Sequence, residues 1–134
     1  AMHLGLLNYF DKADNAFVSA YRKHNESGGF DIVLDYVSSP SIQDRILIIS
    51  DPMLATGTSL AKTILALRKL GTPSKVYVVA AIASRQGIKY LQEIAGDDVD
   101  LWCGDIDNEL NDKGYIIPGL GDAGDLAYGE KLQH

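Results

Sequence analysis

The sequence predicts an α/β fold built on a parallel sheet, and three observations carry this prediction. Residues 46–49, 76–82 and 99–103 are short apolar runs, as expected for strands that are covered on both faces. Residues 59–70 and 86–95, which separate these runs, place apolar side chains at helical spacing. The alternation of strands and helices implies right-handed crossovers, with the helices packed on the sheet. Ligands of such sheets bind beyond the carboxyl ends of the strands.

Each predicted helix has an apolar stripe and a clear end. Leu60, Ile64 and Leu67 lie on one stripe of the first helix, and Gly71 ends it. The second helix closes at Gly96 in the same way. Both helices therefore have one face to bury against the sheet.

Upstream of the sheet, the sequence predicts a hairpin. Residues 15–21 mix β-branched, aromatic and small side chains and read as a strand, with Arg22 at its end. Residues 27–29 mark a turn, and residues 31–37 form the second arm. From residue chemistry alone, we expect Arg22 to be a solvated charge.

Composition limits the class of protein. The chain has 134 residues, of which 46% are hydrophobic and 22% charged, and we expect residues 1–134 to form a single domain. No run approaches the roughly 20 apolar residues of a membrane helix, and no basic, apolar leader opens the chain. We therefore expect a cytoplasmic protein without a membrane partner. The net charge of −6 counts against a nucleic-acid partner.

Cysteine and histidine usage predicts neither a disulfide nor a metal site made by the protein alone. Cys103 is the single cysteine, and its place at the end of an apolar run favours a buried core thiol over a reactive one. His3, His24 and His134 are far apart in sequence and suggest no metal cluster.

The loop after the first predicted strand has the composition of an anion site. Gly57 permits close approach of the backbone to a ligand, and Thr56, Thr58 and Ser59 add hydroxyl groups. The start of the following helix supplies N–H groups and the positive end of the helix dipole. These features suit a phosphate monoester.

Asp51 lies at the end of the predicted strand, where its carboxylate can accept hydrogen bonds from sugar hydroxyls. The loop therefore suits a phosphorylated sugar better than a bare phosphate. No Lys follows Gly57, which counts against a nucleotide-binding P-loop. In a second interpretation, Asp51 with Thr58 or Ser59 only caps the helix. Residue spacing leaves both interpretations open.

Residues 115–125 contain three glycines and one proline. A segment of this composition is usually a mobile surface loop. Glycines also expose peptide N–H and C=O groups, which can bind a ligand without any charged side chain. Tyr115 is equally suited to core packing and to ring contact, and Asp125 is predicted to cap a helix at residues 126–131.

Two motifs carry a resemblance to a known family. Asp51-Pro-Met-Leu-Ala-Thr-Gly-Thr-Ser59 resembles the phosphoribosyl pyrophosphate (PRPP) loop of uracil phosphoribosyltransferases, and its Pro-Met-Leu-Ala insert is specific to that branch of the type I phosphoribosyltransferases. Thr58 stands where the family commonly has a second glycine. Tyr115-Ile-Ile-Pro-Gly-Leu-Gly-Asp-Ala-Gly-Asp125 resembles the uracil-binding signature of the same family. The likeness extends over essentially the whole chain.

The resemblance implies roles for individual residues. It makes Asp51 and Asp122 the catalytic candidates, with Asp51 facing the ribose hydroxyls and no general base identified. The residues implied in PRPP binding are Arg22, Asp51, Pro52, Met53, Leu54, Ala55, Thr56, Gly57, Thr58, Ser59 and Asp122. The residues implied in uracil binding are Tyr115, Ile116, Gly121, Asp122 and Ala123.

The resemblance also implies a type I phosphoribosyltransferase-like fold in three layers, with a flexible hairpin over the site and a C-terminal base-binding segment. The implied reaction converts uracil and PRPP to uridine monophosphate (UMP) and pyrophosphate in pyrimidine salvage. Mg²⁺ would bind mainly through PRPP, and the protein would form a homodimer or a higher homo-oligomer. Regulation by GTP is left open.

By the same resemblance, the N-terminal part of the family is absent from this chain, including an Arg-Ala-Gly stretch that contacts PRPP. We therefore expect the 134-residue chain to be weak or inactive and a complete protein to be active. Three alternatives remain from the sequence. One is a phosphoribosyltransferase for another base, the second is a non-catalytic protein that senses PRPP or a nucleotide or binds RNA, and the third is a degenerate fragment with only a structural role.

Overall fold

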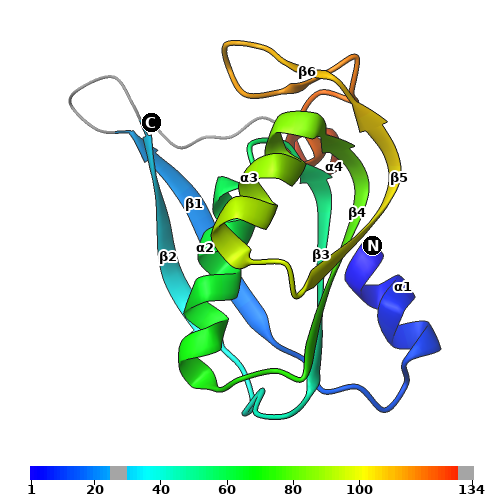
Figure 1. Ribbon diagram of the computed structural model, residues 1–134. Coiled ribbons are helices and arrows are strands. Elements are labelled where there is room, and N and C mark those ends of the chain that lie inside the picture. The colour runs from blue at the N-terminus through cyan, green and yellow to red at the C-terminus, as the bar shows by residue number, and fades with distance from the viewer. Residues whose placement is uncertain (25–29, 130–134) are drawn as a thin grey trace.

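A computed structural model describes residues 1–24 and 30–129, except for the side chains at 21–24 and 30–35 (Figure 1). The elements in chain order are α1 (Met2–Tyr9), β1 (Phe17–His24), β2 (Phe30–Ser38), β3 (Ile46–Leu54), α2 (Thr58–Leu67), the 3-10 turn η1 (Arg68–Leu70), β4 (Lys75–Ser84), α3 (Arg85–Ala95), β5 (Val99–Asp107), β6 (Glu109–Leu110), β7 (Ile116–Ile117) and α4 (Ala123–Tyr128).

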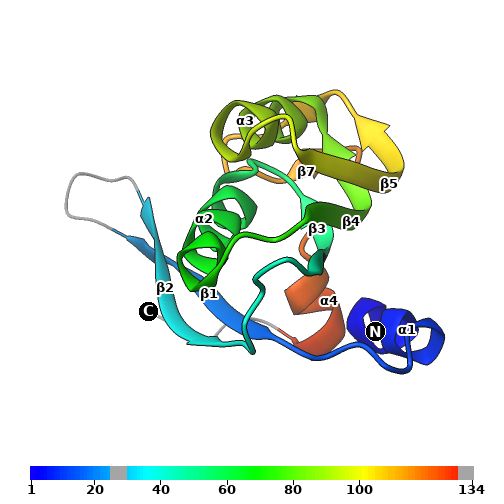
Figure 2. The ribbon, with the colours of Figure 1, turned by 60° about the horizontal axis from the view of Figure 1, so that its bottom comes forward.

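The centre of the fold is a parallel sheet in the order β3-β4-β5. α2 and α3 cover one of its faces, and α1 and α4 lie on the opposite side (Figures 1 and 2). This arrangement confirms the predicted α/β class, the parallel sheet and the three layers. The strand–helix–strand alternation read from the sequence is therefore the scaffold of the molecule.

The core lies between the sheet and the α2–α3 layer. On β4, Val76, Val78 and Ala80 alternate toward this layer, as the two-residue period of a strand requires. Burying a Val, Leu or Ile side chain stabilises a fold by roughly 1.5–3 kcal/mol, so this layer is the main source of stability. The buried cluster consists of Leu54, Leu60, Ala61, Ile64, Val76, Val78, Ala80, Ala83, Leu91, Ala95 and Val99.

The opposite face of the sheet is much less covered. On β5, Leu101 and Cys103 pack against the core cluster, whereas Trp102 points the other way and is 66% exposed. Ile46 on β3 is 64% exposed. Cys103 is therefore half-buried at the margin of the core, so the prediction of a buried core thiol holds in its packing but not in complete burial.

Several element boundaries differ from those predicted. β3 continues to Leu54 instead of ending at residue 49, because the loop motif remains paired with β4. The helix predicted to reach residue 70 ends at Leu67 and tightens into η1. The sequence did not predict α1, because its apolar residues do not gather on one face of the helix, and α1 contains no buried residue.

β1 and β2 form the predicted antiparallel hairpin, which extends beside α2 (Figure 1). A bulge interrupts the register between Ser19 and Ala20. Arg22 lies in β1 opposite Ile32, and its side chain is outside the described part of the structure. The predicted turn at residues 27–29 also lies outside the described residues.

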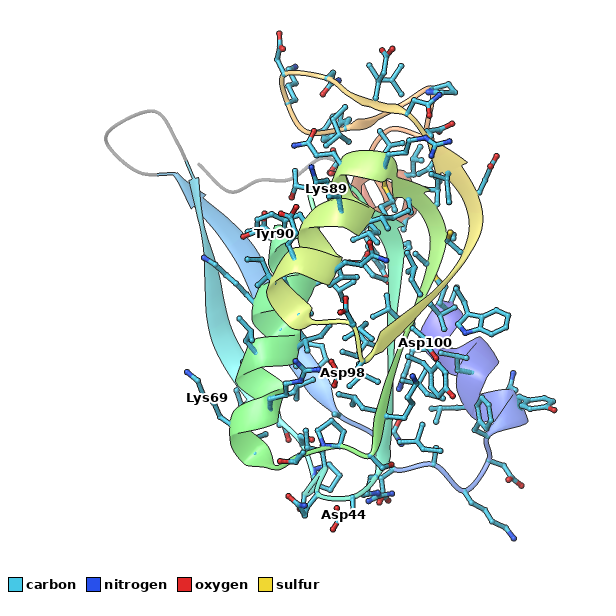
Figure 3. The ribbon with its side chains drawn as sticks, in the orientation of Figure 1. Asp44, Lys69, Lys89, Tyr90, Asp98 and Asp100 are labelled. Atoms are coloured by element: carbon cyan, nitrogen blue, oxygen red, sulfur yellow. The ribbon has the colours of Figure 1, made fainter. Side chains whose placement is uncertain are left out.

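Ion pairs join the elements at the amino end of the sheet. Arg68 donates through Nη2 to both carboxylate oxygens of Asp98, at 2.9 and 2.8 Å, and through Nη1 to the Ala95 carbonyl. Lys75 and Asp100 pair across β4 and β5 at 3.0 Å. Figure 3 shows Asp98 and Asp100 near the start of β5. These charges stand at the end of the sheet opposite to the one where ligands of parallel sheets bind.

No helix among residues 1–24 and 30–129 combines the length and the apolar character needed to cross a bilayer.

Replacing Ile64 by Ala should lower the free energy of unfolding by about 2–5 kcal/mol, because a fully buried side chain leaves a cavity. Leu65, the next residue of α2, is 42% exposed, so Leu65→Ala is the matched control and should cost about 1 kcal/mol or less. Urea denaturation measures both values. Equal losses would contradict the assignment of the buried face of α2.

Candidate functional site

Both predicted motifs lie at the carboxyl end of the parallel sheet. Residues 55–57 connect β3 to α2, and residues 108–122 follow β5. In Figures 1 and 2, α4 lies beside β3, on the face opposite to α2 and α3, so the second motif returns from β5 toward the strand that carries the first. This end of the sheet is the expected place for a ligand.

The loop between β3 and α2 is short and closely packed. Gly57 has a φ of 77°, which favours glycine, and a Cβ atom there would stand 2.5 Å from the Gly87 carbonyl oxygen in the first turn of α3. A Cβ atom on Gly87 would in turn collide with the Ala55 carbonyl oxygen. The loop and α3 thus touch backbone to backbone at two glycines.

Ser84 fastens the same contact. Its side chain is fully buried at the end of β4, where its Oγ accepts a hydrogen bond from Gly87 N (2.8 Å) and donates one to the Ala55 carbonyl (2.5 Å). Ser84 is therefore both the N-cap of α3 and a support of the loop. Sequence analysis missed this residue, although a serine directly before a predicted helix is a recognised N-cap signal.

The first turn of α2 has no side-chain cap. The N-cap residue is Gly57, and the first main-chain bond of the helix joins Ala61 N to the Gly57 carbonyl at 2.9 Å. The Thr56 hydroxyl reaches Thr58 N only at 3.4 Å. The interpretation in which Asp51 with Thr58 or Ser59 merely caps this helix is therefore wrong. The first turn of α2 contains no acidic side chain, so none within that turn balances the positive end of the helix dipole.

Asp51 lies within β3, three residues before the end of the strand, and is half-buried. Its Oδ1 accepts a hydrogen bond from Met53 N at 2.9 Å, which fixes the orientation of the carboxylate. Burial raises the pKa of Asp51, and the hydrogen bond from Met53 opposes this rise only in part. A partly desolvated carboxylate beside an anion cradle is a common feature of functional sites.

The glycine-rich segment is held by a small hairpin. β6 and β7 pair with Leu110 opposite Ile116, and the Asn111 side chain closes their turn by accepting from Lys113 N (3.0 Å) and Tyr115 N (2.9 Å). Ile116 is 1% exposed, and Tyr115 is half-buried. The first part of the segment therefore has fixed pairing and a buried anchor.

The turn after β7 displays main-chain groups. The Ile117–Pro118 bond is cis, and Gly119 and Gly121 have φ values of 54° and 81°. Gly119 N donates to Asp107 Oδ2 at 2.9 Å, so the end of β5 holds this turn. A Cβ atom on Gly119 would collide with the Ile116 carbonyl oxygen, whereas nothing lies within 4 Å of one on Gly121. Gly119 is thus required for space and conformation, and Gly121 for conformation alone.

Asp122, not Asp125, caps the last described helix. α4 begins at Ala123, three residues earlier than predicted, and Asp122 Oδ1 accepts from Gly124 N (2.8 Å) and Asp125 N (3.0 Å). Asp125 lies in the first turn, where its negative charge suits the helix dipole. The prediction failed because an aspartate at either position satisfies the same local N-cap rule.

The structure gathers most of the predicted site residues at one end of the sheet. Those from residue 51 to 59 lie on β3, the loop and the first turn of α2, and those from 115 to 123 lie on β7, on the turns directly before and after it, and at the start of α4. Leu54 is 1% exposed, so only its main chain can meet a ligand. The described residues contain no group of three or more His, Cys, Asp or Glu side chains arranged as a metal site.

Comparisons with known proteins agree with this geometry. A sequence model of the family described as uracil phosphoribosyltransferase matches residues 1–130. Curated relatives with that name include one from Porphyromonas gingivalis (51% identical, covering 97% of this chain and 60% of the relative) and one from Pyrococcus furiosus (41%, 96% and 55%). A solved structure from Aquifex aeolicus matches with a TM-score of 0.85 at 37% identity, covering 96% of this chain and 60% of that chain. The chain thus spans little more than half the length of these proteins.

Asp51→Asn should change how stability depends on pH. Because burial raises the folded-state pKa of Asp51, the folded state holds its proton more tightly than the unfolded state does. The stability from this carboxyl group is fully present below the unfolded pKa and is lost as the pH rises through the folded pKa. Asparagine keeps the acceptor for Met53 N and cannot ionise.

As the pH rises from the ordinary carboxyl pKa of 3.8, the unchanged chain should therefore lose stability relative to Asp51→Asn. The difference between their free energies of unfolding should level off above the raised pKa of Asp51. Urea denaturation from acidic to neutral pH measures the difference. A difference that stays constant with pH would mean that Asp51 is not desolvated.

Proposed function

Because the chain belongs to the uracil phosphoribosyltransferase family, we propose that its two motifs bind PRPP and uracil and serve their conversion to UMP and pyrophosphate in pyrimidine salvage. The proposal rests on the start of α2, where a glycine N-cap leaves the helix without a side-chain cap, directly after the loop with the PRPP-like sequence. A helix start of this kind is suited to an anion such as the 5-phosphate of PRPP.

At the phosphate end, residues 55–59 would hold the 5-phosphate through main-chain N–H and hydroxyl groups. Gly57 lets the backbone approach closely, and Thr56, Thr58 and Ser59 supply the hydroxyls. Asp51, oriented by Met53 N, would accept hydrogen bonds from the ribose hydroxyls. Arg22, on the hairpin, would reach the pyrophosphate, for which a guanidinium is well shaped.

At the base end, the turn from Ile116 to Ala123 would read uracil mainly through peptide groups. The Ile116 side chain is buried, so its contribution would come from the main chain. Main-chain donors and acceptors matched to uracil reject cytosine, because an exchanged amine leaves buried polar groups unpaired. Asp122, which caps α4, would lie between the base and PRPP.

In the proposed reaction, N1 of uracil bonds to C1 of the ribose, the bond from C1 to the pyrophosphate oxygen breaks, and the N1 proton leaves the base. The transition state carries positive charge near C1, so the protein acts mainly by positioning both substrates and stabilising charge. Asp51 and Asp122 are the two carboxylates that we propose for this role. No general base is assigned.

Magnesium, when bound, neutralises the charge of the departing pyrophosphate. The ion would be held mainly by oxygens of PRPP, with few direct protein ligands. The homo-oligomeric state and the cytoplasmic location stay predictions of the sequence. Neither another base nor a purely sensory role gains support from the relatives, which carry the uracil phosphoribosyltransferase name.

Asp51→Asn should weaken PRPP binding by roughly tenfold or more while changing uracil binding little, because hydrogen bonds to a charged group are the stronger ones. Asp44→Asn is the control, since Asp44 stands at the amino end of the sheet (Figure 3) and asparagine tolerates its φ of 58°. Calorimetric titration with each substrate measures both affinities. An unchanged PRPP affinity would remove Asp51 from the site.

The 134-residue chain should form UMP slowly or not at all, and a version extended upstream to the length of its relatives should be active. The chain spans 60% of the Porphyromonas gingivalis relative, and Trp102 on the open face of the sheet is 66% exposed. Rates of UMP formation from uracil, PRPP and Mg²⁺ decide the point. Equal rates for the two chains would contradict this expectation, and inactivity of both would contradict the proposed function.

A further inference from the structure

Both motifs are hydrogen-bonded to one pair of neighbouring residues on adjacent strands, Ser84 and Asp107, which we call the rung. Ser84, the last residue of β4, lies opposite Asp107, the last residue of β5, in the parallel register. Ser84 Oγ donates to the Ala55 carbonyl in residues 55–59, which we call the phosphate loop. Asp107 Oδ2 accepts from Gly119 N in residues 116–123, which we call the base-binding turn. The two motifs, far apart in sequence, are therefore both fastened to a single pair of neighbouring residues.

The Ser84 side of this rung is rigid. Ser84 is the only polar residue that is fully buried among the described ones, and both functions of its hydroxyl are used, one toward Ala55 and one toward Gly87. The bonded carbonyl of Ala55 turns toward α3, where the two glycines exclude any side chain from the contact. The direction of the loop backbone is thereby set by β4 and α3, not by α2 alone.

The Asp107 side acts on a tightly packed glycine of the turn. Gly119 has a φ of 54°, a Cβ atom on it would collide with the Ile116 carbonyl oxygen, and its N–H is the group that Asp107 holds at 2.9 Å. A carboxylate acceptor makes this bond stronger than a neutral one. The same turn leads directly to Gly121 and Asp122, the residues expected to face the base.

We propose that Ser84 and Asp107 are a pair of positioning residues, which set the phosphate loop and the base-binding turn at the separation that one nucleotide requires. Neither residue needs to touch a ligand, because each acts through the backbone that it holds. Misplacement of a binding group by about 1 Å can cost two orders of magnitude in rate, so a shared rung is an effective way to fix the two loops. The assignment of a phosphate to the first motif and of a base to the second rests on the proposed function.

The two halves of the rung can be separated with ligand fragments. Ser84→Ala should weaken the binding of ribose 5-phosphate and UMP by roughly threefold to tenfold and leave the affinity for uracil unchanged. Asp107→Ala should weaken the binding of uracil and UMP to a similar extent and leave the affinity for ribose 5-phosphate unchanged. Asp107→Asn retains an acceptor for Gly119 N and should keep most of the affinity. Calorimetric titration of the 134-residue chain measures all three ligands.

The controls are residues of the same type that hold neither motif. Ser74→Ala changes an exposed serine before β4, and Asp105→Ala removes an exposed carboxylate from β5 that bonds only to the next residue in sequence among the bonds described. Both should leave all three affinities unchanged. Equal weakening of both fragments by Ser84→Ala or Asp107→Ala would mean a general loss of structure and would overturn the proposal.

Amide hydrogen exchange of the ligand-free chain tests the rung independently of the proposed function. Ser84→Ala should speed exchange in residues 55–61 and Asp107→Ala in residues 116–124, each leaving the other region at its original rate. Exchange unchanged at these sites would refute the positioning role even if UMP binds. If neither the 134-residue chain nor the version extended upstream binds UMP but the exchange responses appear, the proposed function fails while the rung stands.

Discussion

A close backbone-to-backbone contact joins the loop between β3 and α2 to the first turn of α3, and the rest of the fold is built around it. Gly57 and Gly87 meet there at a distance that leaves no room for a Cβ atom on either residue. A larger residue at either position would push α3 away from the loop and disturb the α2–α3 layer that forms the core. The geometry of the candidate site and the packing of the molecule are therefore set by one backbone contact.

Two aspartates of the site have contrasting environments. Asp51 is half-buried within a strand, its pKa is raised by desolvation, and a single main-chain N–H orients it. Asp122 stands at a helix start, where it accepts two main-chain N–H groups and complements the dipole of α4. Burial costs stability at Asp51, while capping contributes stability at Asp122. The residue with the unfavourable environment is the one expected to meet the sugar, as is common where a group is kept for function.

The sheet is covered unequally. One face carries α2, α3 and the whole buried cluster, whereas the other leaves Ile46 and Trp102 more than half exposed. The chain spans about 60% of the length of the Porphyromonas gingivalis relative. The buried cluster of the described elements thus lies on the side that carries α2 and α3, and the exposed apolar side chains of Ile46 and Trp102 lie on the other.

The sequence by itself determined the parallel sheet, the two covering helices, the hairpin and the positions of the two motifs expected to bind ligands, because periodicity, glycine position and motif spacing are local properties. It did not determine that β3 continues through Asp51, that Asp122 caps α4, or that Ser84 and Asp107 hold the two motifs. Ser84 meets Ala55 across 29 residues, and Asp107 meets Gly119 across 12, so no local pattern records these contacts. Only the tertiary structure decided them, because the register of neighbouring strands brings such residues together after the sheet has formed.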